Sequence, residues 1–128
     1  MSKFKSIFKD YKKALTRLED VLKQEKNEFI RDSAIQRFEI AFELAWKSAK
    51  AFLEEKHNTR CVSPQNCFRE CFRLGLIDYD DTWLSMLHDR NMTVHTYNEE
   101  IAEEIYKKIP EYLKILNSLS DSLSKSEF

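Results

Sequence analysis

The near absence of helix-breaking residues is the feature that most limits what this chain can fold into. Its 128 residues include one glycine and two prolines. Glycine supplies the backbone freedom for tight turns and proline interrupts helices, so this chain has few tight turns and little to break its helices. A chain of this length forms one domain and can bury its own core. We therefore expect residues 1–128 to be a single all-α domain, with a polar tail that frays from about residue 118 to 128.

Apolar residues recur every three or four positions along most of the chain, as they do in amphipathic helices. This spacing predicts a first helix over about residues 4–23 and a long second helix over about 29–55. The last helix starts after a cap at Asn98 or Thr93, a choice that the sequence leaves open. Pro110 lies inside it and should kink it or end it early.

Two shorter helices are expected in the middle of the chain. Ser63-Pro64 is a helix start signal, because serine caps a helix and proline suits the first helical position. Gly75 ends this third helix, since glycine accepts the left-handed conformation of many helix ends. Asp80 or Asp81 caps a fourth helix that runs to about Arg90. The whole pattern predicts an antiparallel bundle of five helices, four of them long enough to define the core.

The charge of the chain is almost balanced, with 21 basic and 22 acidic residues and a net charge of −1. This balance argues against a broad electrostatic footprint for nucleic acid, although it leaves room for a small basic site. No apolar run is long enough to cross a membrane, and the first residues are not followed by the apolar core of a signal peptide. We expect a cytoplasmic protein whose cysteines are reduced.

One histidine and three cysteines raise the question of a zinc site. His57, Cys61, Cys67 and Cys71 are separated by three, five and three intervening residues, which is not the usual paired CxxC spacing. Cys67 and Cys71 share a helix face and are expected to be small core residues. We therefore expect no metal.

The segment from residue 90 to 97 concentrates chemically useful side chains at the joint between two helices. Arg90 has a charged planar fork that fits phosphate. His95 belongs to the residue type that gives and takes protons near neutral pH. Tyr97 offers a hydroxyl. This joint is a candidate site for attack on a phosphodiester, or for receiving a nucleotide.

Each of these three residues also has a plainer interpretation. Arg90 shares the apolar face of its helix, so it can be an inward arginine paired with Glu39 or Glu43. His95 can be purely structural, and Tyr97 can be a packing residue. Because histidine and tyrosine are two positions apart, they face the same way in an extended joint and opposite ways in a helix.

The neighbouring polar residues are open to two interpretations as well. Asn91 and Thr93 can donate hydrogen bonds to a phosphate, but Asn91 can equally cap the end of the fourth helix. Glu39 and Glu43 can act as an acid and base pair. Lys47 follows Glu43 by four residues and favours a solvated row of ion pairs instead.

The joint and its flanks resemble the HEPN-domain proteins, and in particular the branch called nucleotidyltransferase substrate-binding proteins. The resemblance covers most of the chain, and the departures from it are Cys67, Cys71 and a tail rich in lysine and serine. The matching stretches are Arg37-Phe38-Glu39, Phe42 to Lys47, Ser63-Pro64, Arg69-Glu70, Phe72 to Ile77, Trp83, Met86-Leu87, Arg90-Asn91, Thr93 and His95 to Glu100.

This resemblance implies a homodimer that faces its two R-x4-H segments across a shared cleft. It also implies a minimal nucleotidyltransferase as a separate partner chain, often in a heterotetramer. The chain itself lacks a phosphate-cradling glycine-rich loop and does not look like the nucleotidyltransferase.

Two functions follow from the resemblance. In the first, the chain is the endoribonuclease toxin of a toxin-antitoxin-like pair and needs neither metal nor cofactor. His95 acts as general base or acid on a ribose 2′-OH, Arg90 stabilises the phosphate charge, and the partner silences the toxin by nucleotide transfer to Tyr97. In the alternative, the chain is a non-catalytic subunit that holds nucleotide or substrate for the partner. The near-neutral charge favours the alternative, whereas the intact R-x4-H-x-Y segment favours the ribonuclease.

Overall fold

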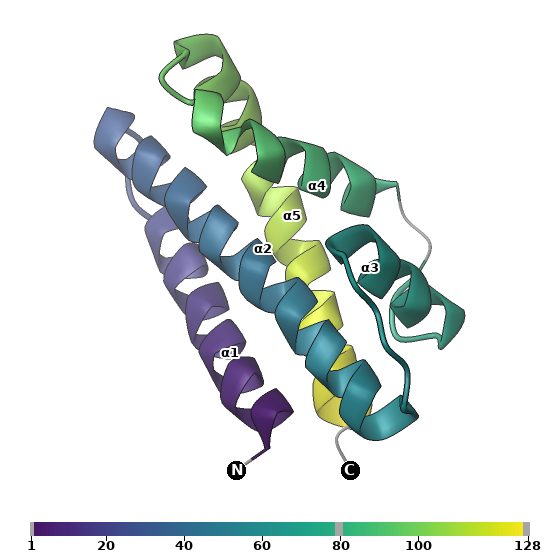
Figure 1. Cartoon of the computed structure of the whole chain (residues 1–128). Helices are drawn as coiled ribbons and strands as arrows, with labels where there is room; N and C mark the ends of the chain where they lie inside the picture. Colours follow the sequence, from purple (N-terminus) through teal and green to yellow (C-terminus); the bar gives the residue numbers. More distant parts are fainter. Residues whose placement is uncertain (1, 79–80, 127–128) are drawn as a thin grey trace.

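The computed structural model describes residues 2–78 and 81–126 as a bundle of α-helices, with no strand in those ranges (Figure 1). The prediction of an all-α bundle of five helices is confirmed. In chain order the elements are α1 (Lys3–Leu22), α2 (Glu28–His57), α3 (Pro64–Arg73), α4 (Thr82–Met92), the one-turn 3-10 helix η1 (Thr93–His95) and α5 (Glu99–Ser126).

The three long helices lie side by side along the length of the molecule. α1 and α2 form an antiparallel pair, and α5 runs beside α2 in the same direction (Figure 1). This direction is possible because α3 and α4 carry the chain back to the end where α2 begins. The joint between α4 and α5 therefore lies at that end of the bundle.

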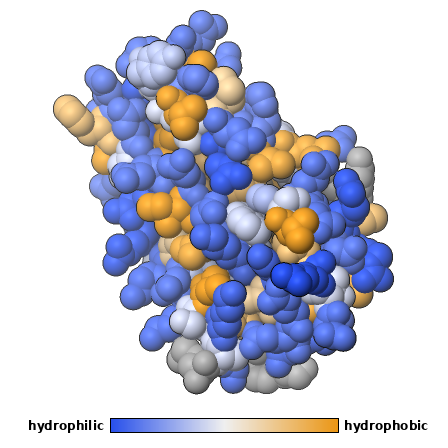
Figure 2. Space-filling model, viewed as in Figure 1, coloured by the Kyte–Doolittle hydropathy of each residue, from blue (hydrophilic) through white to orange (hydrophobic). Residues whose placement is uncertain are grey.

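Aromatic side chains tie the long helices into one core. The Tyr11 hydroxyl of α1 donates a hydrogen bond to the Leu116 carbonyl of α5 at 2.5 Å. The rings of Phe38 on α2 and Tyr112 on α5 stack with their centres 5.4 Å apart. Hydrophilic residues cover most of the surface seen in Figure 2, with apolar patches between them. Within the described ranges, no helix combines the length and apolar character needed to cross a bilayer.

The helix boundaries follow the local signals closely. The Ser63 hydroxyl accepts a hydrogen bond from the Asn66 backbone N–H, with Pro64 in the first turn of α3. Gly75 follows the end of α3 with a φ of +76°, the conformation for which a glycine was expected there. The Asn98 side chain accepts hydrogen bonds from the first backbone N–H groups of α5, which decides the cap that the sequence left open.

The start of α4 fits the prediction only in part. Asp81 is the residue before α4, but its side chain forms no capping hydrogen bond to the helix. The other proposed cap, Asp80, lies outside the described residues.

The last helix is longer than expected. Pro110 lies inside α5 but does not end it, and the helix continues to Ser126. The prediction of a frayed tail is wrong for residues 118–126, because Leu119 and Leu123 are fully buried. With Leu116 they continue the apolar stripe at spacings of three and four, so packing holds the helix where its polar composition indicated fraying.

Candidate functional site

The joint between α4 and α5 is a compact turn and not an extended linker. α4 passes directly into η1, so Asn91 is a helical residue and not the cap of α4. The Thr93 hydroxyl donates to the Arg90 carbonyl at 2.7 Å, and the Thr96 hydroxyl donates to the Thr93 carbonyl at 3.0 Å. These local bonds satisfy backbone carbonyls at the helix end and hold the candidate residues in a defined arrangement.

Arg90 is held by α2. Its Nη1 donates to Glu43 Oε2 at 2.8 Å and its Nε donates to Asn91 Oδ1 at 3.1 Å. Its guanidinium carbon lies 5.2 Å from the centre of the Phe42 ring. The interpretation of Arg90 as an arginine paired with α2 is therefore confirmed, with Glu43 as the acid. Nη2 forms no hydrogen bond within the described residues and the side chain keeps 24% of its exposure, so this nitrogen keeps its donors for solvent.

A second contact from α2 fixes the start of η1. Thr93 Oγ1 lies 2.9 Å from Glu39 Oε2, so this carboxylate and the Arg90 carbonyl share the single hydroxyl proton. The solvated row of ion pairs predicted for α2 is also present, with Lys47 Nζ 3.5 Å from Glu43 Oε1. Glu39 and Glu43 thus act as supports for Thr93 and Arg90.

His95 and Tyr97 come together on the same side of the joint. The Tyr97 hydroxyl lies 3.4 Å from His95 Nδ1, and the two rings meet edge to face with centres 5.9 Å apart. Which atom donates depends on the histidine tautomer. Tyr97 is 81% exposed and His95 is half-buried. The sequence left this geometry open, and the turn after η1 decides it.

The structure adds a buried carboxylate that the sequence interpretation missed. Asp89 is almost fully buried and accepts hydrogen bonds from the Tyr112 hydroxyl at 2.5 Å and from Lys108 Nζ at 3.2 Å. Burial, and after it the hydrogen bond to Asp89, raises the pKa of Tyr112 well above its usual value. The available signal was an acidic residue three positions after the buried Met86, on the inward face of α4. Asp89 anchors α4 on α5 and so fixes the orientation of the neighbouring Arg90.

A buried arginine connects the starts of α2 and α5 next to the joint. Arg31 donates to Glu99 at 2.6 Å, to Asp32 at 3.0 Å and to Glu103 at 3.2 Å. The hydrogen bond with Glu99 raises the arginine pKa above its usual value. It also lowers the pKa of Glu99. Lys26 binds Glu103 as well, at 2.6 Å. This network holds α5 where it leaves the joint.

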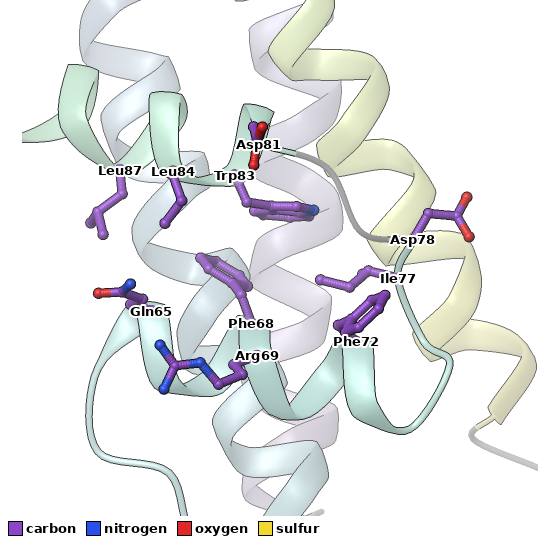
Figure 3. Close-up of a pocket in the computed structure, with 10 residues that line it drawn as sticks. All are labelled: Gln65, Phe68, Arg69, Phe72, Ile77, Asp78, Asp81, Trp83, Leu84 and Leu87. Carbon is purple, nitrogen blue, oxygen red and sulfur yellow. The ribbon is translucent and has the colours of Figure 1, made fainter.

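A pocket of about 380 Å³ lies between α3 and α4 (Figure 3). The rings of Phe68 and Trp83 pack together with centres 4.2 Å apart, and Leu84 and Leu87 project from α4 toward α3. Its remaining lining residues are Gln65, Arg69, Phe72, Ile77, Asp78 and Asp81. The pocket does not include the Arg-x4-His joint, which begins one helical turn beyond Leu87.

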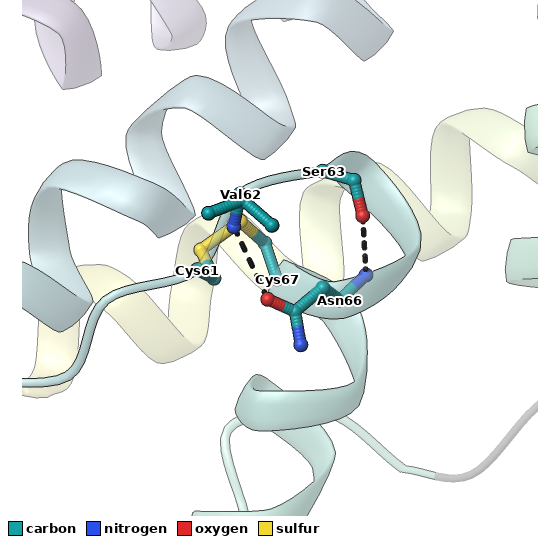
Figure 4. The surroundings of a disulfide bond; sticks show 5 residues. All are labelled: Cys61, Val62, Ser63, Asn66 and Cys67. Carbon is teal, nitrogen blue, oxygen red and sulfur yellow. Dashed lines mark hydrogen bonds between the residues drawn. A yellow bond between two sulfur atoms is a disulfide. The ribbon is translucent and has the colours of Figure 1, made fainter.

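A disulfide bond braces the start of α3, where the sequence predicted reduced cysteines. Cys61 in the loop after α2 is bonded to Cys67 on α3 (Figure 4). The Ser63-Pro64 turn brings their Cα atoms within 5.1 Å, although this fold-back is not visible in the spacing alone. Cys71 stays a free, buried thiol, and burial raises its pKa to about 12. Among the described residues, no three or more His, Cys, Asp or Glu side chains are grouped to hold a metal.

The protein is a small all-α bundle with an Arg-x4-His joint between its fourth and fifth helices. The family described as nucleotidyltransferase substrate binding protein like matches residues 6–125, and the chain belongs to this family.

Known proteins similar to this chain agree with that assignment. A Haemophilus influenzae protein named probable ribonuclease HepT is 36% identical over 84 residues, which cover 62% of this chain and 58% of that relative. A solved structure from Thermus thermophilus is 36% identical, with a TM-score of 0.83 over 88% of this chain and 98% of the other. A Haemophilus influenzae structure described as the fold of a substrate binding domain of a nucleotidyltransferase is 25% identical. Its TM-score is 0.70 over 94% of this chain and 96% of the other.

Proposed function

We propose that the chain is the HEPN-type member of a toxin-antitoxin-like pair and a metal-independent endoribonuclease that a minimal nucleotidyltransferase silences. The observation that carries this proposal is the arrangement at the joint. Arg90 is oriented by Glu43 with one edge of its fork open, and His95 follows within a single compact turn. The similarity to a probable ribonuclease HepT supports the same activity. A cytoplasmic location, where RNA and nucleotides are available, is part of this proposal.

The proposed reaction needs only the side chains of the joint. His95 removes the proton from a ribose 2′-OH, and the 2′-oxygen attacks the adjacent phosphorus. The bond to the 5′-oxygen breaks, that oxygen takes up a proton, and a 2′,3′-cyclic phosphate remains. Arg90 stabilises the negative charge that grows on the phosphate oxygens, a contribution that typically reaches about 100-fold in rate or more. Asn91 and Thr93 are the neighbouring candidates for phosphate contacts: Asn91 has a free amide NH2, and a phosphate contact by Thr93 replaces its bonds to Glu39 and the Arg90 carbonyl. No cofactor takes part.

A homodimer is part of the proposal, and the exposed face of α4 and η1 supports it. Leu84, Leu87, Asn91 and Val94 follow one another at spacings of three, four and three, the pattern by which helices pair. Leu84 is 49% exposed and Val94 is 71% exposed, so this stripe is uncovered in a single chain. Pairing of two such stripes around a twofold axis brings both Arg90 side chains toward one cleft. Two nucleotidyltransferase chains added to this dimer complete the proposed heterotetramer.

The partner is proposed to modify Tyr97. The exposed hydroxyl attacks the α-phosphate of ATP, its proton leaves with solvent or His95, and pyrophosphate departs. The added nucleotide is bulky and anionic, so it crowds the joint and competes for Arg90.

A second candidate function is a non-catalytic subunit that holds nucleotide or substrate for the partner. The near-neutral net charge of the chain favours it, because the chain as a whole offers no broad electrostatic footprint for RNA. The similarity to a structure described as a substrate binding domain of a nucleotidyltransferase favours it as well.

The test is RNA cleavage by the purified chain in the presence of a chelator. Wild type should cleave a labelled RNA to products with a 2′,3′-cyclic phosphate. Arg90→Ala and His95→Ala should each lose cleavage by about 100-fold or more, with helical signal and light-scattering mass unchanged. If wild type cleaves no RNA but binds nucleotide or the partner enzyme, the second function replaces the first.

A further inference from the structure

The outward face of α1 carries a concentration of positive charge that the net charge of the chain conceals. Residues 3–17 contain six basic residues and one acidic residue, Asp10, which gives this segment a charge of +5 in a chain of net charge −1. All six basic side chains are exposed. We call them the α1 basic face: Lys3, Lys5, Lys9, Lys12, Lys13 and Arg17.

The basic face borders a concave seam between α1 and α2. Two neighbouring grooves of about 180 Å³ and 290 Å³ lie along this seam, and Arg17 and Arg37 line both of them. Arg37 comes from α2 and is half-buried, while Lys13 lines the first groove. Two arginines from different helices therefore meet where the grooves join.

These cations lack acceptors within the described part of the chain. Lys13, Arg17 and Arg37 form no ion pair or hydrogen bond there through their charged groups, even though Asp10 and Asp20 also line the grooves. The guanidinium donors of Arg17 and Arg37 are thus left to solvent, and a phosphate fits the fork of an arginine with two hydrogen bonds. The seam thus presents three cationic side chains that form no ion pair with the carboxylates of Asp10 and Asp20 beside them.

The seam is distinct from the Arg-x4-His joint. Arg37 lies on the side of α2 that borders α1, in line with Ile40 of the same groove. Glu39 and Glu43 lie on another side of α2, where they contact Thr93 and Arg90. Neither the candidate catalytic chemistry nor the dimer stripe uses Arg37, although it belongs to one of the stretches that resemble the family.

We propose that the α1 basic face, together with Arg37, binds the phosphate backbone of RNA independently of sequence. Lys9, Lys13 and Arg17 are four residues apart and form a line of charges at steps of about 6 Å along the helix. None of the large apolar side chains that the structure exposes lies on α1, and of them only Ile40 of α2 lines these grooves. This surface therefore has little of the apolar area with which a helix inserts into a membrane. The proposal rests on the proposed ribonuclease function, for which this surface holds the substrate.

The salt dependence of RNA binding tests the proposal. Binding of a fluorescent single-stranded RNA 20-mer is measured by anisotropy in chelator over a series of KCl concentrations. His95→Ala is the background, so that the RNA stays intact. The binding constant falls with salt, and each lost phosphate contact makes the slope of log K against log salt less negative by about 0.7. The double variant Arg17→Gln with Arg37→Gln should therefore make the slope less negative by about 1.4. Affinity at low salt should fall by about tenfold or more.

The matched control is Lys107→Gln with Lys114→Gln on α5. Both lysines are exposed, and the net charge changes by the same amount. Circular dichroism of every variant checks the fold. An unchanged slope in the arginine variant, or an equal loss in the α5 control, overturns the proposal. So does binding of phosphatidylserine vesicles by wild type without binding of RNA.

The same variants separate this proposal from the proposed function. In the catalytically intact chain, loss of Arg17 and Arg37 should raise KM for RNA cleavage and leave kcat unchanged. If wild type cleaves RNA and the arginine variant keeps the wild-type KM and salt slope, the basic face is refuted and the ribonuclease stands. If the arginine variant loses RNA binding, and wild type shows no RNA cleavage that His95→Ala abolishes, the ribonuclease is refuted and the basic face stands.

Discussion

Arg90 Nη1 lies 2.8 Å from Glu43 Oε2, and this hydrogen bond joins the end of α4 to the middle of α2. The hydrogen bond orients the guanidinium of Arg90, and it occupies one of the guanidinium donors with a carboxylate. Because Nη2 keeps no partner within the described residues, the arginine is oriented and still has a free edge. This edge is the part of the guanidinium that we propose to contact phosphate.

Removing the carboxylate at position 43 should affect catalysis more than stability. In Glu43→Ala, Arg90 loses its orientation, so kcat for RNA cleavage should fall by about tenfold or more while KM changes little. The free energy of unfolding should fall by about 1 kcal/mol or less, because the pair is partly exposed. Lys47→Ala is the control, since Lys47 contacts Glu43 from the solvent side at 3.5 Å. Wild-type kcat in Glu43→Ala would show that the pair does not orient Arg90.

The Arg31 network should make stability depend on pH in the acid range. The hydrogen bond from Arg31 lowers the pKa of Glu99 in the folded chain below the ordinary value of 4.5, and hydrogen bonds from Lys26 and then Arg31 lower the pKa of Glu103. The stabilisation is therefore complete above that value and is lost as the pH falls through the lower folded pKa values. Thermal unfolding between pH 6 and pH 2 should show this loss in wild type. In Arg31→Gln the decline should be shallower, and parallel curves for the two proteins would contradict the assignment.

The hydrogen bond between Tyr112 and Asp89 should stabilise the fold. Tyr112→Phe leaves a buried carboxylate without one of its donors, which should lower the free energy of unfolding by about 1–3 kcal/mol in urea. Tyr106→Phe is the matched control, because the Tyr106 hydroxyl has no hydrogen bond within the described residues. Equal stability of the two variants would show that the buried bond contributes nothing.

The disulfide bond should be detectable by counting thiols. The chain has three cysteines, of which Cys71 is free, so one thiol should react in denaturant without reductant and three after reduction. Reduction should lower the free energy of unfolding by about 2 kcal/mol, since the closed loop is short. Cys61→Ser with Cys67→Ser should be insensitive to reductant. Three reactive thiols in protein purified without reductant would restore the expectation of reduced cysteines.

Tyr97 should accept a nucleotide from the partner enzyme. Incubation with the nucleotidyltransferase and ATP should add the mass of one nucleotide at this position, because the hydroxyl is exposed beside His95. Intact-mass spectrometry with peptide mapping locates the modification. Tyr97→Phe should stay unmodified and should not be silenced, whereas Tyr106→Phe should be modified as wild type is. Modification that persists in Tyr97→Phe would remove this residue from the site.

The helices and most of their ends were determined by the sequence itself. Ser63-Pro64 and Gly75 mark the limits of α3, because caps and left-handed glycines act within a few residues of the backbone they satisfy. The Arg-x4-His segment was also visible, since its residues are close neighbours in the chain. The tail was misjudged because its polar composition outweighed Leu119 and Leu123.

Tertiary structure decided every pairing between distant residues. Glu39 and Glu43 were equal candidates for Arg90, and only the packing of α4 on α2 selects Glu43. Asp89 and Tyr112 are 23 positions apart in the sequence, and no local pattern predicts the hydrogen bond between them. Periodicity tells which side of a helix faces inward, but the rotation and crossing of the packed helices determine which side chains meet there.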